Sequence, residues 1–269
     1  MKLGCTRIKR ICNGAFVNTH AFTHDVESKF AIILAHDVLD VHDDFHFLIK
    51  RLYDKYNVIT FDLAGHGSSG NLDKYNYDVY LQDCMNVVNL AKNRLIVWIG
   101  KGVGFILGAK LAAITNSTIF GLVGFDFCKY QNAGARVADV ECEYTNLQKA
   151  RLSFYQKYNH IPTHILNELF LYRYKILNSK FVNNYHINLL TEIDKFFGVD
   201  MEKILDDILC HSLLFVDSKN SFKQKKILDF VPVNKDLCFL HENKHLDLIE
   251  NFVDMICNDG SYLIEKFRR

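Results

Sequence analysis

The chain has 269 residues, 49% of them hydrophobic, so it is long and apolar enough for one α/β domain with an inserted segment. Its 32 basic and 31 acidic residues leave a net charge of +1, which excludes a strong overall attraction to nucleic acids or anionic membranes. Because it has no apolar leader and no run of about 18 apolar residues, we expect a cytoplasmic protein without a membrane span.

Short apolar runs rich in β-branched residues alternate along the chain with segments that are apolar at i, i+3 and i+4. The first pattern predicts buried parallel strands, and the second predicts amphipathic helices. In chain order, the predicted strands are residues 31–35, 58–61, 95–99, 119–125, 213–216 and 237–240, and the predicted helices are residues 45–56, 79–92, 103–114, 222–230 and 246–256. This succession predicts a mostly parallel, doubly wound sheet of the eight-stranded type, with an antiparallel hairpin from residues 10–22 at its edge.

Residues 130–208 break this alternation, because their pattern is helical and aromatic without a convincing strand. We therefore expect a helical cap insertion at 130–208, with residues 1–129 and 209–269 forming the α/β core. The aromatic side chains of the insertion would pack it onto the core or line a pocket beneath it.

A strand, a tight turn and a helix follow one another in LIVWIGKGVGFILGAKLA, residues 95–112. Gly100 and Gly104 frame the turn, where a Cβ atom would push the strand and the following helix apart. Gly102 lies at the apex, and glycine adopts a positive φ there without strain. The spacing therefore predicts a sharp strand-to-helix turn whose apex carries no side chain.

Three local sequences, in this order, resemble the α/β-hydrolase fold superfamily of the esterase, lipase and epoxide-hydrolase type: IILAHDVLD (32–40), VITFDLAGHGSSG (58–70) and the turn at 95–112. The resemblance implies an α/β-hydrolase fold in which the turn is the nucleophile elbow. The superfamily has Ser at the apex, or occasionally Asp or Cys, where this chain has Gly102. The resemblance therefore implies a catalytically inactive member.

The other catalytic positions implied by the resemblance are also altered. Asn220 takes the position of the acid, and His245 takes that of the histidine, so Gly102, Asn220 and His245 would be the remains of a triad. Asp126 is an alternative acid, because some members place the acid after the preceding strand.

The oxyanion loop would offer the backbone N–H groups of Val38 and Val103, by the same resemblance. Asp37 replaces a glycine of the superfamily beside Val38, and its carboxylate would disfavour a developing oxyanion.

Several competing interpretations concern the same segments. A dinucleotide-binding loop at residues 100–108 would need glycine at position 105 or 107, where the chain has Phe105 and Leu107. His36 and His66 are expected to brace the loops beside the site. His42 and His46 flank two aspartates, but they begin an amphipathic helix, so we expect no metal there.

The sequence thus predicts a pseudo-hydrolase that acts as a binding, regulatory or structural subunit, with an unidentified protein partner or small apolar ligand and no cofactor. The alternative is an active ester or amide hydrolase of the serine or cysteine type with a displaced nucleophile. Ser68, Ser69 and Cys128 are the candidates for that role.

Overall fold

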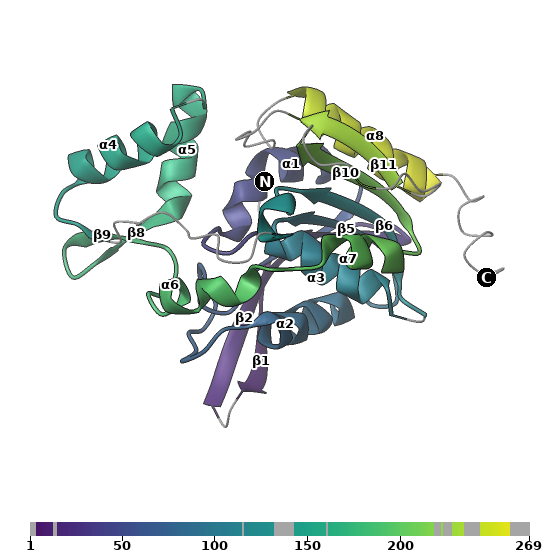
Figure 1. Ribbon diagram of the computed structural model, residues 1–269, viewed down its shortest axis with the longest axis horizontal. Coiled ribbons are helices and arrows are strands. Elements are labelled where there is room, and N and C mark those ends of the chain that lie inside the picture. Colours follow the sequence, from purple (N-terminus) through teal and green to yellow (C-terminus); the bar gives the residue numbers. More distant parts are fainter. Residues whose placement is uncertain are drawn as a thin grey trace.

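An eight-stranded, mostly parallel sheet forms the centre of the computed structural model (Figure 1). The structure describes residues 4–12, 15–114, 116–131, 143–159, 161–217, 222, 228–233 and 243–258. The strand order is β1-β2-β4-β3-β5-β6-β10-β11, and only the pairs β1–β2 and β2–β4 are antiparallel. The strands are β1 (Gly4–Cys12), β2 (Ala15–His24), β3 (Phe30–Ala35), β4 (Asn57–Asp62), β5 (Leu95–Lys101), β6 (Ile119–Phe125), β10 (His211–Asp217) and β11 (Leu228–Val233).

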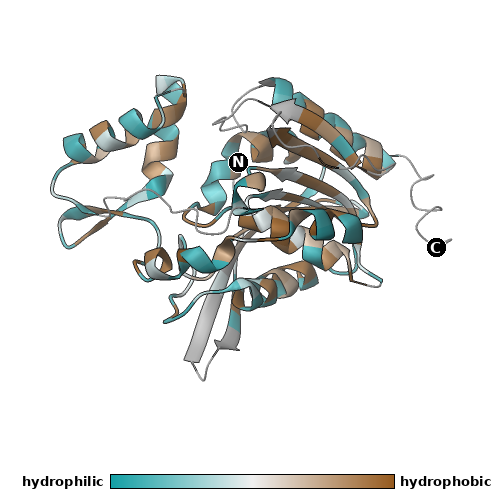
Figure 2. Cartoon of the chain, viewed as in Figure 1, coloured by the Kyte–Doolittle hydropathy of each residue, from teal (hydrophilic) through white to brown (hydrophobic). Residues whose placement is uncertain are grey.

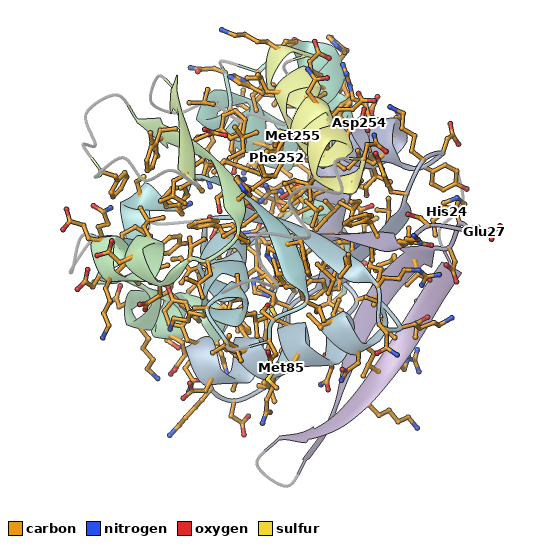
Figure 3. All side chains as sticks on the ribbon, turned by 90° about the vertical axis from the view of Figure 1, so that its right-hand side faces the viewer. His24, Glu27, Met85, Phe252, Asp254 and Met255 are labelled. Carbon is orange, nitrogen blue, oxygen red and sulfur yellow. The ribbon has the colours of Figure 1, made fainter. Side chains whose placement is uncertain are left out.

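Helices cover both faces of this sheet because successive residues of the central strands alternate between two apolar clusters. On β3, for example, Ile33 packs into the cluster with α2, α3 and α7, whereas Ile32 and Leu34 pack into the cluster with α1 and α8. The hydropathy colouring follows this layering, and exposed residues such as Met85 on α2 point away from the sheet (Figures 2 and 3). The helices of the two layers are α1 (His46–Leu52), α2 (Tyr77–Asn89), α3 (Val103–Ala112), α7 (Met201–Asp207) and α8 (Asn243–Asn258).

Most of the predicted core elements are confirmed. The edge hairpin exists, although it is longer than residues 10–22, and β5 lies between β3 and β6 in the middle of the sheet. The helix expected at 222–230 is wrong, because residues 228–233 form β11, which pairs with β10. Its proline, Pro232, argues against a central strand, but β11 ends the sheet of the described residues, where proline is tolerated. The strand expected at 237–240 lies outside the described residues.

The chain between β6 and β10 contains further helices together with a small three-stranded sheet of order β7-β9-β8. The expectation that this region has no strand is wrong. These strands are only two to four residues long and mostly exposed, so no alternation of buried apolar residues signals them. The elements are β7 (Glu143–Tyr144), α4 (Leu147–Lys157), α5 (Thr163–Arg173), β8 (Tyr174–Leu177), β9 (Lys180–Asn183) and α6 (Leu189–Glu192).

Residues 143–183, which we call the outer lobe, have an apolar core of their own. Phe154, Leu166 and Phe170 belong to this core, and Phe47 of α1 packs against both it and the α1–α8 cluster. The outer lobe projects to one side of the sheet in Figure 1. It is thus a small packed unit attached to the larger one.

Candidate functional site

The turn between β5 and α3 has the geometry that the glycine spacing predicts. Gly102 has φ 52° and ψ −117°, which confirms the expected positive φ at the apex. A Cβ atom on Gly104 would lie 2.1 Å from the carbonyl oxygen of Ala35, so the close contact of α3 with β3 requires glycine there. The sharp strand-to-helix turn that the glycine spacing predicts is therefore present.

The carboxyl group of Asp37 fills the space next to this apex. A Cβ atom on Gly102 would lie 2.1 Å from Cγ of Asp37 and equally close to its Oδ1. Real Cβ atoms do not approach other heavy atoms to this distance, so a side chain at 102 and the present position of Asp37 exclude each other. Asp37 is 1% exposed.

Four donors bind the Asp37 carboxylate. Its Oδ1 accepts hydrogen bonds from the backbone N–H groups of Val38 and Val103, both at 2.9 Å, and from the Tyr130 hydroxyl at 2.7 Å. Its Oδ2 lies 2.5 Å from Nζ of Lys129. Val38 and Val103 are the two residues whose N–H groups were expected to form the oxyanion hole. Both N–H groups therefore already bind an anionic oxygen of the chain itself.

The surroundings of Tyr130 and Lys129 raise the pKa of both side chains. Burial raises the pKa of the Tyr130 hydroxyl, and the neighbouring carboxylate of Asp37 raises it further. Burial alone would lower the pKa of Lys129, but attraction to Asp37 and Asp126 outweighs it and raises the pKa. Tyr130 is therefore a hydroxyl donor and Lys129 a cation at neutral pH.

His36 and His66 link the loops after β3 and β4. Nε2 of His36 accepts from the N–H of Leu63, and Nε2 of His66 accepts from the N–H of Leu39, both at 3.0 Å. Each Nδ1 faces a backbone carbonyl, so each ring is neutral with its proton on Nδ1. Burial lowers the pKa of both rings, that of His66 to about 3. The interpretation of these histidines as braces is confirmed.

His42 is a partner of Asp62 rather than of its neighbour His46. Nδ1 of His42 lies 3.0 Å from Oδ1 of Asp62, and Nε2 of His46 lies 3.3 Å from Glu168 of α5. Hydrogen bonding to His42 outweighs burial and lowers the pKa of Asp62 to about 2. In the described part of the chain, no group of three or more His, Cys, Asp or Glu side chains is arranged to hold a metal ion.

A buried ionic network connects the outer lobe with the loop beside the elbow. The guanidinium of Arg173, the last residue of α5, binds the carboxylates of Asp40 and Asp44, and Nζ of Lys101 lies 2.6 Å from Oδ2 of Asp40. Lys101 lies 3.9 Å from Asp126 as well. The side chain of Lys101 thus joins this network.

The two carboxylates of the network titrate in opposite directions. Burial would raise the pKa of Asp40, but attraction to Arg173 and Lys101 outweighs it and holds the pKa well below its usual value. Burial and repulsion from Asp40 raise the pKa of Asp44 to about 7, despite the attraction of Arg173. One cationic side chain of the lobe therefore holds two acids that repel each other.

The remaining triad positions are only partly covered by the structure. His245 lies buried in the first turn of α8, with its ring edge-on to Phe215 at 5.5 Å between centroids. Asn220 lies outside the described residues, and the triad relation of His245 to Gly102, which the resemblance implies, stays a prediction. Asp126, the alternative acid, follows β6 with φ 56° and faces Lys101.

The three candidates for a displaced nucleophile lie in different surroundings. The hydroxyl of Ser69 is buried and donates to the carbonyl oxygen of Asp62 at 2.6 Å. Ser68 is exposed, and its N–H donates to the Asp62 carboxylate. Cys128 has a partly buried thiol and lies just before Lys129. A proton committed to a backbone carbonyl makes Ser69 a poor nucleophile.

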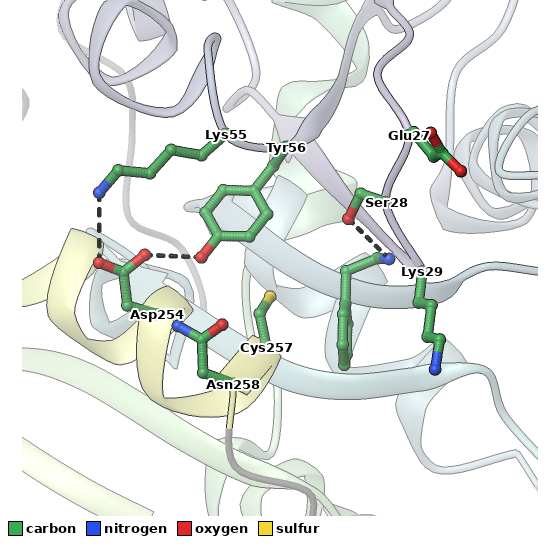
Figure 4. Close-up of a pocket in the computed structure, with 9 residues that line it drawn as sticks. Glu27, Ser28, Lys29, Lys55, Tyr56, Asp254, Cys257 and Asn258 are labelled. Carbon is green, nitrogen blue, oxygen red and sulfur yellow. Dashed lines mark hydrogen bonds and ion pairs between the residues drawn. The ribbon is translucent and has the colours of Figure 1, made fainter.

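A pocket of about 540 Å³ lies at the amino ends of the parallel strands, away from the turn between β5 and α3 (Figure 4). Its lining comes from the residues that lead into β3 and β4 and from the end of α8, and the Tyr56 hydroxyl and Lys55 both bind Asp254. Parallel strands place the elbow at their carboxyl ends, whereas this pocket lies at their amino ends. Of the predicted site residues that the structure describes, none lines it.

Comparison with solved structures identifies the fold. E-2-(acetamidomethylene)succinate hydrolase matches with a TM-score of 0.74 and 16% identity over 93% of this chain and 100% of that one. An α/β-hydrolase from Novosphingobium aromaticivorans matches with a TM-score of 0.71 and 14% identity over 93% and 98%. The peroxisomal α/β-hydrolase of Saccharomyces cerevisiae gives 0.69 and 10% over 96% and 90%. The chain therefore has the α/β-hydrolase fold.

No protein-family model and no curated protein sequence matches this chain. Among the described helices, none is both long enough and apolar enough to cross a bilayer.

Proposed function

We propose that this protein is a pseudo-hydrolase, an α/β-hydrolase fold that acts by binding rather than by hydrolysis. One observation carries the proposal: the Asp37 carboxylate fills the space of a side chain at position 102 and binds the two N–H groups, of Val38 and Val103, that would form the oxyanion hole. Hydrolysis of an ester needs a nucleophile at the apex and vacant donors for the oxyanion. Gly102 supplies no nucleophilic atom, and Asp37 engages the donors.

Electrostatics argue in the same direction as sterics. A tetrahedral oxyanion at Val38 and Val103 would lie against a carboxylate that is itself held by Lys129 and Tyr130. An oxyanion at these N–H groups would lie next to the carboxylate oxygen that already binds them, and two negative charges so close together repel each other strongly in a buried site. Restoring only the nucleophile would therefore leave the site unable to stabilise the transition state.

We further propose that residues 130–208 act as a cap that is fixed to the core rather than as a mobile lid. Arg173 ties α5 to Asp40 and Asp44, and the N–H of Gly67 donates to the carbonyl of Asn184 at 2.8 Å. A cap held by buried ionic and backbone bonds suits a static binding surface. The alternative of an active hydrolase requires the same region to admit a substrate.

The test is labelling of the purified protein by a fluorophosphonate probe, together with turnover of short-chain p-nitrophenyl esters. We expect neither. Labelling that is abolished by Ser68→Ala, Ser69→Ala or Cys128→Ala would identify a displaced nucleophile and overturn the proposal. A small apolar ligand or partner protein recovered with the native protein would identify what the scaffold binds.

Gly102→Ser alone should give no esterase activity, because Asp37 still fills the site and Asn220 stands at the acid position. The triple variant Gly102→Ser, Asn220→Asp, Asp37→Gly should give weak activity, since it supplies a nucleophile, an acid and vacant N–H donors. The double variant Gly102→Ser, Asn220→Asp is the matched control. Full activity from Gly102→Ser alone would show that Asp37 does not block the site.

A further inference from the structure

The outer lobe carries a concentration of exposed aliphatic side chains. Five of the nine large hydrophobic residues that are exposed in the described chain belong to residues 143–183, and they come from α4, α5 and β8. These five are Leu147 (42% exposed), Leu152 (60%), Leu171 (71%), Ile176 (71%) and Leu177 (54%). Single exposed leucines are ordinary, but five on one small unit are a concentration that calls for a physical reason.

The lobe is also strongly basic. Its segment, residues 143–183, contains six basic residues and two acidic ones, a net charge of +4, so the rest of the chain carries −3. Both acids already have partners, since Glu143 binds Lys180 and Glu168 binds His46. Arg173 is the only one of the six basic residues that is turned toward buried acids of the core; the others are exposed on the lobe.

The near-zero charge of the whole chain hides this separation. A net charge of +1 sums the basic and acidic residues of the whole chain and does not describe how they are distributed. It therefore does not exclude attraction of the lobe to an anionic membrane. Attraction to a charged surface acts over about a Debye length, roughly 8 Å at physiological salt, so the charge of the nearest unit decides it.

The kinds of residue distinguish a lipid surface from a protein partner. Protein interfaces are enriched in aromatic residues and depleted in lysine. The lobe shows the reverse, because its aromatic rings, among them Phe154, Phe170 and Tyr174, pack against each other in its own core. Its exterior offers leucine and isoleucine beside lysine and arginine. Aliphatic side chains that enter the acyl boundary, flanked by cations for the headgroups, suit an anionic membrane.

We propose that the outer lobe docks the protein onto an anionic lipid surface, with Leu171, Ile176 and Leu177 inserted among the acyl chains and Lys149 and Lys175 at the headgroups. The position of the lobe at one side of the molecule leaves the sheet clear of such a surface (Figure 1). This docking is independent of whether the elbow is active.

Co-sedimentation of the full chain with vesicles tests the proposal. The protein should bind phosphatidylcholine vesicles that contain phosphatidylserine, release at high salt, and not bind vesicles of phosphatidylcholine alone. Lys149→Glu with Lys175→Glu should weaken binding by about tenfold or more, since each cation at the surface contributes about a factor of five. Its matched control is Lys29→Glu with Lys203→Glu, two exposed lysines outside the lobe, which should bind as the wild type does.

The apolar part has its own variant pair. Leu171→Ser, Ile176→Ser and Leu177→Ser together should abolish sedimentation, whereas Met85→Ser, Ile114→Ser and Leu209→Ser, at positions outside the lobe that are more than half exposed, should not. Thermal unfolding confirms that both triple variants are folded. Absence of wild-type binding to anionic vesicles, or an equal loss in lobe and control variants, would overturn the proposal. So would a concentration-dependent dimer in ultracentrifugation that only the lobe variants dissociate, because the surface would then bind a second copy.

Discussion

The elbow region and the outer lobe differ in the surroundings of their charged side chains. At the elbow, the carboxylate of Asp37 binds the cation of Lys129 and two backbone N–H groups, next to a network that joins Lys101 with Asp40. On the lobe, the cations and aliphatic side chains are exposed. The polar groups around the turn between β5 and α3 thus satisfy one another within the chain, whereas those of the lobe are available to other molecules. Interaction with other molecules is then expected at the lobe.

Arg173 connects the two regions, so its removal should have the largest effect. Arg173→Met would leave Asp40 and Asp44 as buried acids without their shared cation, and we expect a loss of about 3 kcal/mol of unfolding free energy. Urea unfolding measures it, and hydrogen exchange should show faster exchange in residues 161–190. Arg151→Met, which removes an exposed arginine of the same lobe, is the control. Equal stability of both variants would show that the network does not fix the lobe.

The second variant concerns Asp37. Asp37→Leu would leave the N–H groups of Val38 and Val103, the Tyr130 hydroxyl and Lys129 without their acceptor, which should cost about 2–3 kcal/mol. Asp37→Asn keeps an acceptor oxygen and should cost less. Thermal unfolding compares the two, with the exposed Asp54→Ala as a control. A Leu variant as stable as the wild type would contradict the four-donor description.

The neutral histidine braces make stability depend on pH. Burial lowers the pKa of His66 from 6.5 to about 3, so the unfolded chain binds the additional proton as the pH falls through this window. The contribution of His66 to stability is therefore complete above pH 6.5 and is lost on acidification, by about 2 kcal/mol between pH 7 and pH 5. Urea titrations at the two pH values should show a shallower dependence in His66→Gln. An unchanged slope would mean that His66 takes up its proton over the same pH range in the folded and the unfolded chain.

Much of the fold follows from local patterns in the sequence. The buried strands around the elbow, the glycine-framed turn and the positive φ of Gly102 each depend on residues within one short segment. The interactions that define the site do not. Lys129 and Tyr130 reach Asp37 from about ninety positions away, and no motif in Cys128–Gln131 signals this contact. Likewise, Pro232 argues against a strand at β11. The strands of the lobe are too short and too exposed to show an alternation of apolar and polar residues.

The side chain of Asp37 was expected to disturb the oxyanion loop, and its structural role is larger. In the sequence, Gly102 and Asp37 are two separate departures from the family pattern, because such a pattern assigns each position by itself. The structure places the carboxylate of one residue in the space left by the other. The two departures from the pattern are therefore complementary.

The most direct test of this complementarity is a double-mutant cycle of Gly102→Ala and Asp37→Gly, followed by urea unfolding. The strain of alanine at a φ of 52° is the same in both backgrounds and cancels. What remains is the collision of the new Cβ with the carboxyl group, 2.1 Å away in the wild type. We predict that Gly102→Ala costs at least about 1 kcal/mol more in the wild type than in the Asp37→Gly background. An equal cost in both backgrounds would contradict the central claim that Asp37 occupies the nucleophile's place.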